Sequence, residues 1–91
     1  MKLIWSLQSI EDRKQIYAVI AEHDQRAADE MDVLFRKQAT LLLSFPEMGK
    51  LGRVEGTREL LAHKHYVLVY VRAGNAVVIL TILHTSRQYP V

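Results

Sequence analysis

A chain of 91 residues with 49% hydrophobic and 24% charged side chains has the composition of one globular domain, which argues against a disordered chain. It has no cysteine, so nothing points to an oxidising compartment. The apolar start of the chain is interrupted by Glu11, Asp12 and Arg13, too early for a signal peptide or a membrane span. We therefore expect a cytoplasmic protein without membrane association.

The net charge of +2 hides an uneven distribution. Residues 1–48 hold six Lys/Arg against eight Asp/Glu, a balance of −2, whereas residues 49–91 hold six against two, a balance of +4. A basic half predicts an anionic partner, either an acidic peptide or a phosphate backbone. The alternative is a chance imbalance on a solvated surface.

We expect the chain to begin with a strand over residues 1–5, in which Leu3 and Trp5 share one face. The capping-box spacing of Ser9 and Asp12 then predicts the start of a helix. Its apolar stripe, which reaches to about His23, consists of Ile10, Ile16, Tyr17, Val19 and Ile20. Arg13 interrupts this stripe, and we expect its side chain to reach solvent rather than an acidic partner.

Asp24 is the predicted N-cap of a second helix. Apolar residues recur in it at intervals of three and four: Ala27, Ala28, Met31, Leu34, Phe35, Leu41 and Leu42. The helix should end near Ser44 or Phe45, because Pro46 restricts the residue before it. Since the connection is short, the two helices should form an antiparallel hairpin whose apolar stripes need a covering surface.

The second half of the chain predicts a loop followed by three strands. Residues 46–56 hold three of the four glycines and predict an irregular loop. A strand follows at about 57–62, and then two apolar runs joined by the turn Gly74-Asn75 predict a β-hairpin. The single domain 1–91 is therefore expected to have an α+β fold: an N-terminal strand, an antiparallel helical hairpin and a three-stranded antiparallel C-terminal sheet, in the order β-α-α-β-β-β.

A two-residue turn at Gly74-Asn75 would pair Ala73 with Ala76 and would bring His65 opposite His84 and Ala62 opposite Arg87. On this register an aliphatic face should be buried under the helices: Val67, Val69, Val71, Val78, Leu80 and Ile82. The opposite face is mixed and is expected to be functional: Lys64, Tyr66, Leu68, Tyr70, Thr81, Thr85 and Arg87. A shift of one residue would exchange the two faces.

Two groups of side chains are candidates for chemistry. His63, His65 and His84 lack an accepted metal-ligand spacing, so we interpret them as surface or strand-end residues and predict no metal or other cofactor. A basic cluster could hold a phosphate and move protons, as RNA cleavage requires: Arg58, Lys64, Tyr66, His84 and Arg87. The same residue types occur on many basic sheet surfaces, so we assign no catalytic residue. Trp5, Tyr17 and Phe35 are interpreted as packing residues.

In the order of its motifs, the chain resembles the RelE/ParE superfamily of toxins from bacterial type II toxin–antitoxin (plasmid stabilisation) modules. The likeness is carried by Ser9 through Ile20, Ala27-Ala28, Phe45-Pro46 with Gly49, Gly56 through Leu60, Tyr66 through Tyr70, and Ile82-Leu83-His84 with Arg87 and Pro90. The ParE branch is favoured because Leu60-Leu61-Ala62 is apolar where RelE-like nucleases place an arginine. The pair Leu83-His84 is also common in ParE-like chains. Arg13 departs from the leucine usual in the family.

The resemblance implies a toxin inhibited by a cognate antitoxin, which has a DNA-binding domain and an acidic, amphipathic tail that wraps the toxin. DNA would be contacted only through the antitoxin. The ParE branch implies a non-enzymatic inhibitor of DNA gyrase; the alternative is a RelE-like ribosome-dependent mRNA endonuclease, and a third is an inert partner in operator binding. The residues expected to contact the target or the antitoxin are Arg58, Lys64, Tyr66, His84, Arg87 and Tyr89.

Overall fold

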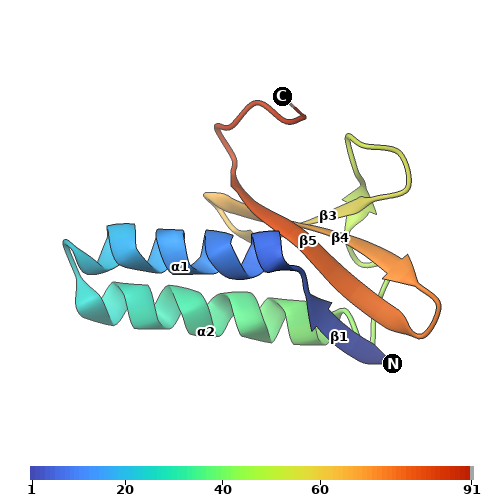
Figure 1. Cartoon of the computed structure of the whole chain (residues 1–91), viewed down its shortest axis with the longest axis horizontal. Helices are drawn as coiled ribbons and strands as arrows, with labels where there is room; N and C mark the ends of the chain where they lie inside the picture. Colours follow the sequence, from blue (N-terminus) through green and yellow to red (C-terminus); the bar gives the residue numbers. More distant parts are fainter. Residues whose placement is uncertain (91) are drawn as a thin grey trace.

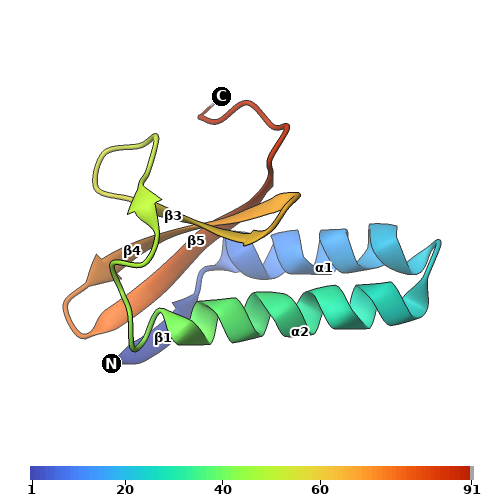
Figure 2. The same ribbon diagram turned by 180° about the vertical axis from the view of Figure 1, so that it is seen from behind.

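The computed structural model describes residues 1–90 and shows a helical hairpin packed against one face of a twisted sheet (Figures 1 and 2). The elements are β1 (Lys2–Trp5), α1 (Leu7–Ala21), α2 (Gln25–Leu41), β2 (Lys50–Leu51), β3 (Arg58–His63), β4 (Tyr66–Ala73) and β5 (Ala76–His84). The predicted α+β class and element order are confirmed. No helix among residues 1–90 is long and apolar enough to cross a membrane.

The sheet has five strands in the order β1-β5-β4-β3-β2, two more than the predicted C-terminal sheet. β1 pairs with β5 in parallel, with Lys2 opposite Ala76, and the other neighbours are antiparallel. The extra strand β2 is only two residues long and lies within the segment predicted as an irregular loop. The first and last strands of the chain therefore lie side by side, as Figure 1 shows.

Helix α1 begins at Leu7 with Ser6 as its N-cap, so the predicted cap at Ser9 is wrong. The Ser6 hydroxyl accepts the Ser9 N–H at 3.0 Å and donates to the Leu80 carbonyl at 2.7 Å. Ser9 is fully buried in the first turn of the helix and donates its hydroxyl to the Ser6 carbonyl. A cap position three residues earlier therefore connects the start of α1 to β5.

Helix α2 has the predicted N-cap, since the Asp24 carboxylate accepts the Ala27 N–H at 3.1 Å. It ends at Leu41, slightly before the predicted end, because residues 42–44 continue as turns rather than as helix. The buried residues of α2 are Ala28, Phe35 and Ala39, of which Phe35 and Ala39 belong to the core under the helices. Ala28 and Phe35 lie on the predicted apolar stripe, whereas Leu41, also predicted to lie on it, is exposed.

The β4–β5 hairpin has the predicted turn but not the predicted register. Gly74 has a φ of 58°, a left-handed conformation that favours glycine, and Ala73 pairs with Ala76 as expected. The register then shifts, because Tyr70 pairs with Ile79 and Val69 with Thr81, which leaves Leu80 as an extra residue. His84 is consequently opposite Tyr66, so the predicted pairings of His65 with His84 and of Ala62 with Arg87 are wrong.

The two faces of β4 are exchanged relative to the prediction, and those of β5 are exchanged only before the bulge at Leu80. The core under the helices contains Phe35, Ala39, Leu42, Ala62, Leu68, Tyr70, Val77, Ile79 and Ile82. Val67, Val69 and Leu83 form a second buried cluster, against which Leu80 and Tyr89 pack. Leu68 and Tyr70 are therefore core residues rather than part of a functional face. Of the aliphatic residues predicted to face the helices, Ile82 lies in the core under them, whereas Val67, Val69 and Leu80 lie on the other side with Tyr89 of the C-terminal tail.

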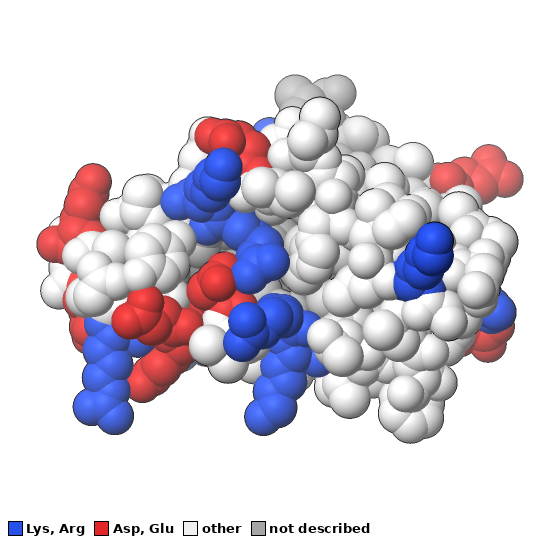
Figure 3. All heavy atoms as spheres, turned by 60° about the horizontal axis from the view of Figure 1, so that its bottom comes forward, with Lys and Arg blue, Asp and Glu red and all other residues white. Residues whose placement is uncertain are grey.

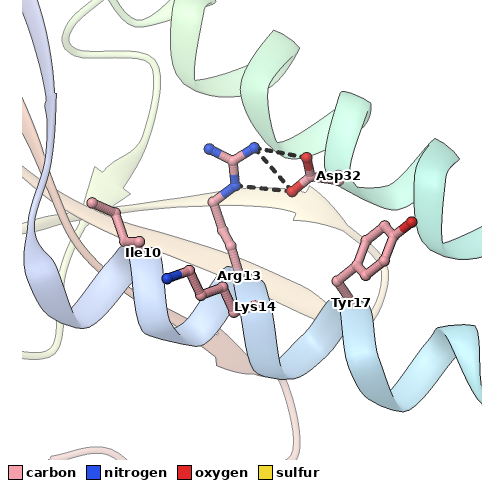
Figure 4. A pocket seen from close by; sticks show the side chains of 5 residues that line it. All are labelled: Ile10, Arg13, Lys14, Tyr17 and Asp32. Atoms are coloured by element: carbon pink, nitrogen blue, oxygen red, sulfur yellow. Dashed lines mark hydrogen bonds and ion pairs between the residues drawn. The ribbon is translucent and has the colours of Figure 1, made fainter.

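Arg13 does not reach solvent as predicted but crosses from α1 to α2 (Figure 4). Its Nε and Nη2 atoms donate to the Asp32 carboxylate at 3.0 and 2.9 Å. The guanidinium carbon also lies 4.5 Å from the centroid of the Trp5 ring. An ion pair and a cation–π contact therefore join β1 and the two helices at one arginine.

Candidate partner-binding site

A groove of about 260 Å³ lies between α1 and the end of the sheet where β4 begins and β5 finishes. It is lined by Asp12, Gln15, Ile16, Val19, Tyr66, Ile82, His84 and Arg87. Three of the six residues predicted to contact a target or partner are in this set: Tyr66, His84 and Arg87. The structure thus brings part of the predicted surface together, at the edge of the core rather than on the outer face of the sheet.

Tyr66 connects the groove to the core. Its ring packs edge-on against Phe35 with the centroids 5.5 Å apart, and against His84 with the centroids 5.4 Å apart. The register shift places Tyr66 and His84 opposite each other at the first residue of β4 and the last of β5. An aromatic pair with one partly buried and one exposed ring therefore forms one wall of the groove.

Two exposed cations lie at this end of the sheet. Arg87 follows β5 in a turn closed by its N–H, which donates to the His84 carbonyl at 2.9 Å. Lys64 is in the turn between β3 and β4, and its carbonyl accepts the Thr85 hydroxyl at 3.4 Å. The acid in the groove, Asp12, is engaged with the Thr81 hydroxyl and the Ile82 N–H. The exposed charge at this end of the groove is therefore positive.

The other two predicted residues, Arg58 and Tyr89, lie elsewhere. The Arg58 guanidinium donates to the carbonyls of Gly49 at 2.8 Å and Glu47 at 3.4 Å, and so holds the loop before β2. Tyr89 packs on the outer face of the sheet, with the Arg53 guanidinium 5.6 Å from its ring centroid. Both therefore have structural contacts within the chain, and the predicted set does not form a single site.

The loop around Gly49 is also held by Tyr70, whose hydroxyl donates to the Pro46 carbonyl at 2.8 Å and accepts the Gly49 N–H at 2.9 Å. Burial raises the pKa of the Tyr70 hydroxyl. A Cβ at Gly49 would lie 2.8 Å from the Tyr70 hydroxyl and 2.9 Å from the Glu59 carbonyl, so only glycine fits there. Tyr70 thus fixes this loop rather than contacting a partner.

Beside the loop, the buried carboxylate of Glu59 accepts the Arg53 main-chain N–H at 2.8 Å and the guanidinium Nη2 at 3.0 Å. The hydrogen bonds from the Arg53 side chain lower the pKa of Glu59, although burial acts in the opposite direction. This ion pair and the Tyr89 ring hold the C-terminal tail near the β2–β3 loop.

Helix α1 supplies the apolar side of the groove, which sequence reasoning did not assign to a site. The buried residues of α1 are small or polar, Ser9 and Asp12, whereas Val19 is 60% exposed and Ile16 is half-buried. Ile16 packs against the core, and the exposed Val19 lies beside it, so α1 gives the groove an apolar wall. The signal in the sequence was the spacing of Ile16 and Val19 on a stripe interrupted by charged residues.

His63, His65 and His84 form a cluster next to Tyr66, which we call the histidine cluster. The ring centroids of His65 and His84 are 5.5 Å apart with an interplanar angle of 11°, and those of His63 and His65 are 5.6 Å apart. Desolvation, then the charges on Lys64, His84 and His63, lower the pKa of His65. Within residues 1–90 no three His, Cys, Asp or Glu side chains are arranged to hold a metal ion.

The face of the helical hairpin carries both signs of charge. Figure 3 shows Lys and Arg interspersed with Asp and Glu over the helices, with a wide, mostly uncharged area beside them. The helices belong to the half of the chain with a balance of −2, so this face does not test the prediction for the basic half, residues 49–91. The groove itself, apolar with cations at one end, is suited to an amphipathic peptide that carries acidic residues.

Comparison with known proteins agrees with this architecture. Residues 3–89 match the sequence model of a family described as the ParE toxin of the type II toxin–antitoxin system, parDE. The chain is 32% identical over 90 residues to a candidate toxin of Sinorhizobium fredii, Y4kP, and the match covers 98% of this chain and 93% of that protein.

Two solved structures share the fold. A chain of the chromosomal ParDE toxin–antitoxin system from P. aeruginosa superposes with a TM-score of 0.83 at 20% identity, covering 92% of this chain and 95% of that one. The protein HP0894 from Helicobacter pylori gives a TM-score of 0.62 at 20% identity, covering 96% and 97%. Because the family model spans almost the whole described chain, the protein belongs to the ParE toxin family of type II toxin–antitoxin systems, and a cognate antitoxin is its partner.

Proposed function

We propose that this toxin is a non-enzymatic inhibitor of DNA gyrase. The observation that carries the proposal is the match of residues 3–89 to the ParE toxin family. The segment 60–62 supports it, because Ala62 is buried and Leu60 packs against the core, so that this part of β3 offers no cation to a nucleic acid. The target would be contacted from the end of the sheet, where Tyr66, His84 and Arg87 meet.

We further propose that an acidic, amphipathic tail of the antitoxin binds in the groove. Ile16, Val19 and Ile82 provide apolar contacts along its length, and Lys64 and Arg87 provide positive charge at one end. Apolar burial would supply most of the affinity, while the cations would mainly accelerate association. Because Tyr66, His84 and Arg87 line the same groove, antitoxin binding would cover the surface proposed to contact the target.

The target is tested with the purified toxin in a gyrase supercoiling assay, with and without antitoxin. We expect loss of supercoiling that the antitoxin restores, and induced cells should show an SOS response before translation stops. Primer extension on translated messages should show no toxin-dependent cut in the ribosomal A site. Position-specific cleavage would instead establish the endonuclease and make Lys64, Tyr66, His84 and Arg87 the candidate catalytic residues.

The binding mode is tested by measuring the affinity for the antitoxin at rising salt concentration. We expect the association rate to fall and the dissociation rate to change little, because salt screens exposed charges but not apolar contacts. Complete loss of binding on raising salt would show that charge rather than burial holds the complex together.

A further inference from the structure

Two members of the histidine cluster have a tautomer fixed by the main chain. The Nδ1 atom of His63 accepts the His65 N–H at 3.1 Å, and the Nδ1 atom of His84 accepts the Ser86 N–H at 3.1 Å. A ring nitrogen that accepts such a bond carries no proton, so neutral His63 and His84 hold their proton on Nε2. Protonating Nδ1 of either ring would place a second N–H group opposite the main-chain N–H and break the hydrogen bond.

The third ring, His65, lies between the other two. It is stacked on His84 at 5.5 Å and lies 5.6 Å from His63, with Lys64 between His63 and His65 in the chain. A positive charge on His65 is opposed by desolvation and then by the Lys64 ammonium and the two neighbouring rings, which lower its pKa. Geometry and charge together favour an uncharged His65 in the free toxin.

The charged and titratable groups around the cluster come from four parts of the chain: Lys64 from the β3–β4 turn, Tyr66 from β4, Arg87 from the tail and Asp12 from α1. The Asp12 carboxylate is already engaged by Thr81 and Ile82. None of the salt bridges within residues 1–90 includes a histidine. The cluster thus has cations beside it, and among residues 1–90 no salt bridge supplies it with a carboxylate to compensate a proton.

We propose that the histidine cluster binds carboxylate groups of the antitoxin tail and takes up protons on binding, so that the complex tightens as the pH falls. The proposal rests on the proposed seating of the acidic tail in the adjoining groove. A carboxylate placed within about 4–6 Å of an imidazole favours its protonated form and supplies the missing counter-charge. The tail acids themselves stay ionised down to about pH 5.

The direction of the pH dependence follows from proton linkage. If the complex holds more protons than its free components, affinity rises as the pH falls, by at most about tenfold per pH unit for each proton taken up. The window is set by histidine: it lies between the lowered pKa of His65 in the free toxin and its raised pKa in the complex, on either side of the ordinary histidine value of about 6.5. Affinity would level off once the free cluster is itself protonated.

The test is isothermal titration calorimetry of toxin and antitoxin at about pH 6.5 in two buffers that differ in ionisation enthalpy. The difference in heat counts the protons taken up, and we expect between about half a proton and two protons per toxin. The triple variant His63→Asn, His65→Asn and His84→Asn should take up almost none. Asparagine oxygens can accept the same main-chain N–H groups at positions 63 and 84 but do not titrate. The control is His23→Asn, an exposed histidine in the turn between α1 and α2.

A buffer-independent heat for the wild type, or equal proton uptake in the triple variant, would overturn the proposal. Because the variant must also fold, nitrogen-15 spectra of wild-type toxin give an independent readout. Antitoxin must raise the pKa of at least one clustered imidazole and leave that of His23 unchanged. Binding without proton uptake would remove only this inference, whereas a failure to inhibit gyrase would remove the proposed target and leave the calorimetry as it stands.

Discussion

The carboxylate of Asp12 accepts the main-chain N–H of Ile82 at 2.9 Å, so a helix residue completes the hydrogen bonding of a strand. β1 pairs with β5 only as far as Ile79, and the bulge at Leu80 follows immediately. Ser6 binds the Leu80 carbonyl on the same edge. The start of α1 therefore takes the place of a neighbouring strand along β5.

Replacing Asp12 by alanine should destabilise the fold by about 2–3 kcal/mol, because the buried Ile82 N–H loses its acceptor. Asp12→Asn should destabilise the fold less than Asp12→Ala, since one side-chain oxygen remains to accept a hydrogen bond. Urea denaturation measures both values. The control is Glu11→Ala, an exposed neighbour whose loss should stay within about 0.5 kcal/mol. Equal stability of Asp12→Ala and the control would show that the contact is dispensable.

Stability should decrease in acid through Glu59. Its pKa is lowered in the folded protein, so between that value and the unfolded value of about 4.5 the unfolded chain binds more protons. The contribution is therefore present above about pH 4.5 and is lost as the pH falls through the folded pKa. Urea midpoints at about pH 7 and about pH 3.5 should differ less in Glu59→Gln than in the wild type. Glu55→Gln, at an exposed position in the loop between β2 and β3, should keep the wild-type pH dependence.

The Arg13–Asp32 pair should show measurable coupling in a double-mutant cycle with Arg13→Leu and Asp32→Asn. The two side chains are 21% and 39% exposed and bond through two nitrogens, which predicts a coupling of about 0.5–1 kcal/mol. The same cycle on Arg26 and Glu30, which are 89% and 68% exposed, should give a smaller value, at most about 0.5 kcal/mol. Equal coupling energies in both pairs would mean that partial burial does not strengthen the Arg13–Asp32 ion pair.

Arg87→Ala should fold normally and lose much of its toxicity. The side chain is exposed in the tail, and the chain from 76 to 91 contains no Asp or Glu to pair with it, so the stability change should lie within about 0.5 kcal/mol. Thermal melts and growth assays at matched expression test this together. Arg72→Ala, an exposed cation near the hairpin turn, should remain toxic. Full toxicity of Arg87→Ala would exclude this arginine from the functional surface.

Local signals in the sequence predicted the positions of caps and turns. The Asp24 cap and the Gly74-Asn75 turn depend on the preferences of one or two residues and are confirmed. The cap of α1 was missed because Ser6 and Ser9 both precede apolar residues, and the choice between them depends on a contact with Leu80, far along the chain. Such a contact is not visible in local spacing.

The orientation of the hairpin could not be predicted for a physical reason. Alternation divides a strand into two faces but does not say which face meets the helices when both are covered. Here Val67, Val69 and Leu83 are buried under the tail that carries Tyr89, so an aliphatic face was not evidence for helix contact. The bulge at Leu80 then changed the phase of β5 and paired His84 with Tyr66.

The parallel pairing of residues 2–5 with residues 76–79 has a consequence for biosynthesis. The strand β1 has no hydrogen-bonding neighbour until residues 76–79 have been added, and contacts this distant in sequence form late. We therefore expect a nascent toxin to stay incompletely folded, and harmless, until β5 has been synthesised. A chain truncated before Ala76 should lack the circular dichroism of the folded sheet. The time before β5 is made would also give the antitoxin an interval in which to meet the newly released toxin.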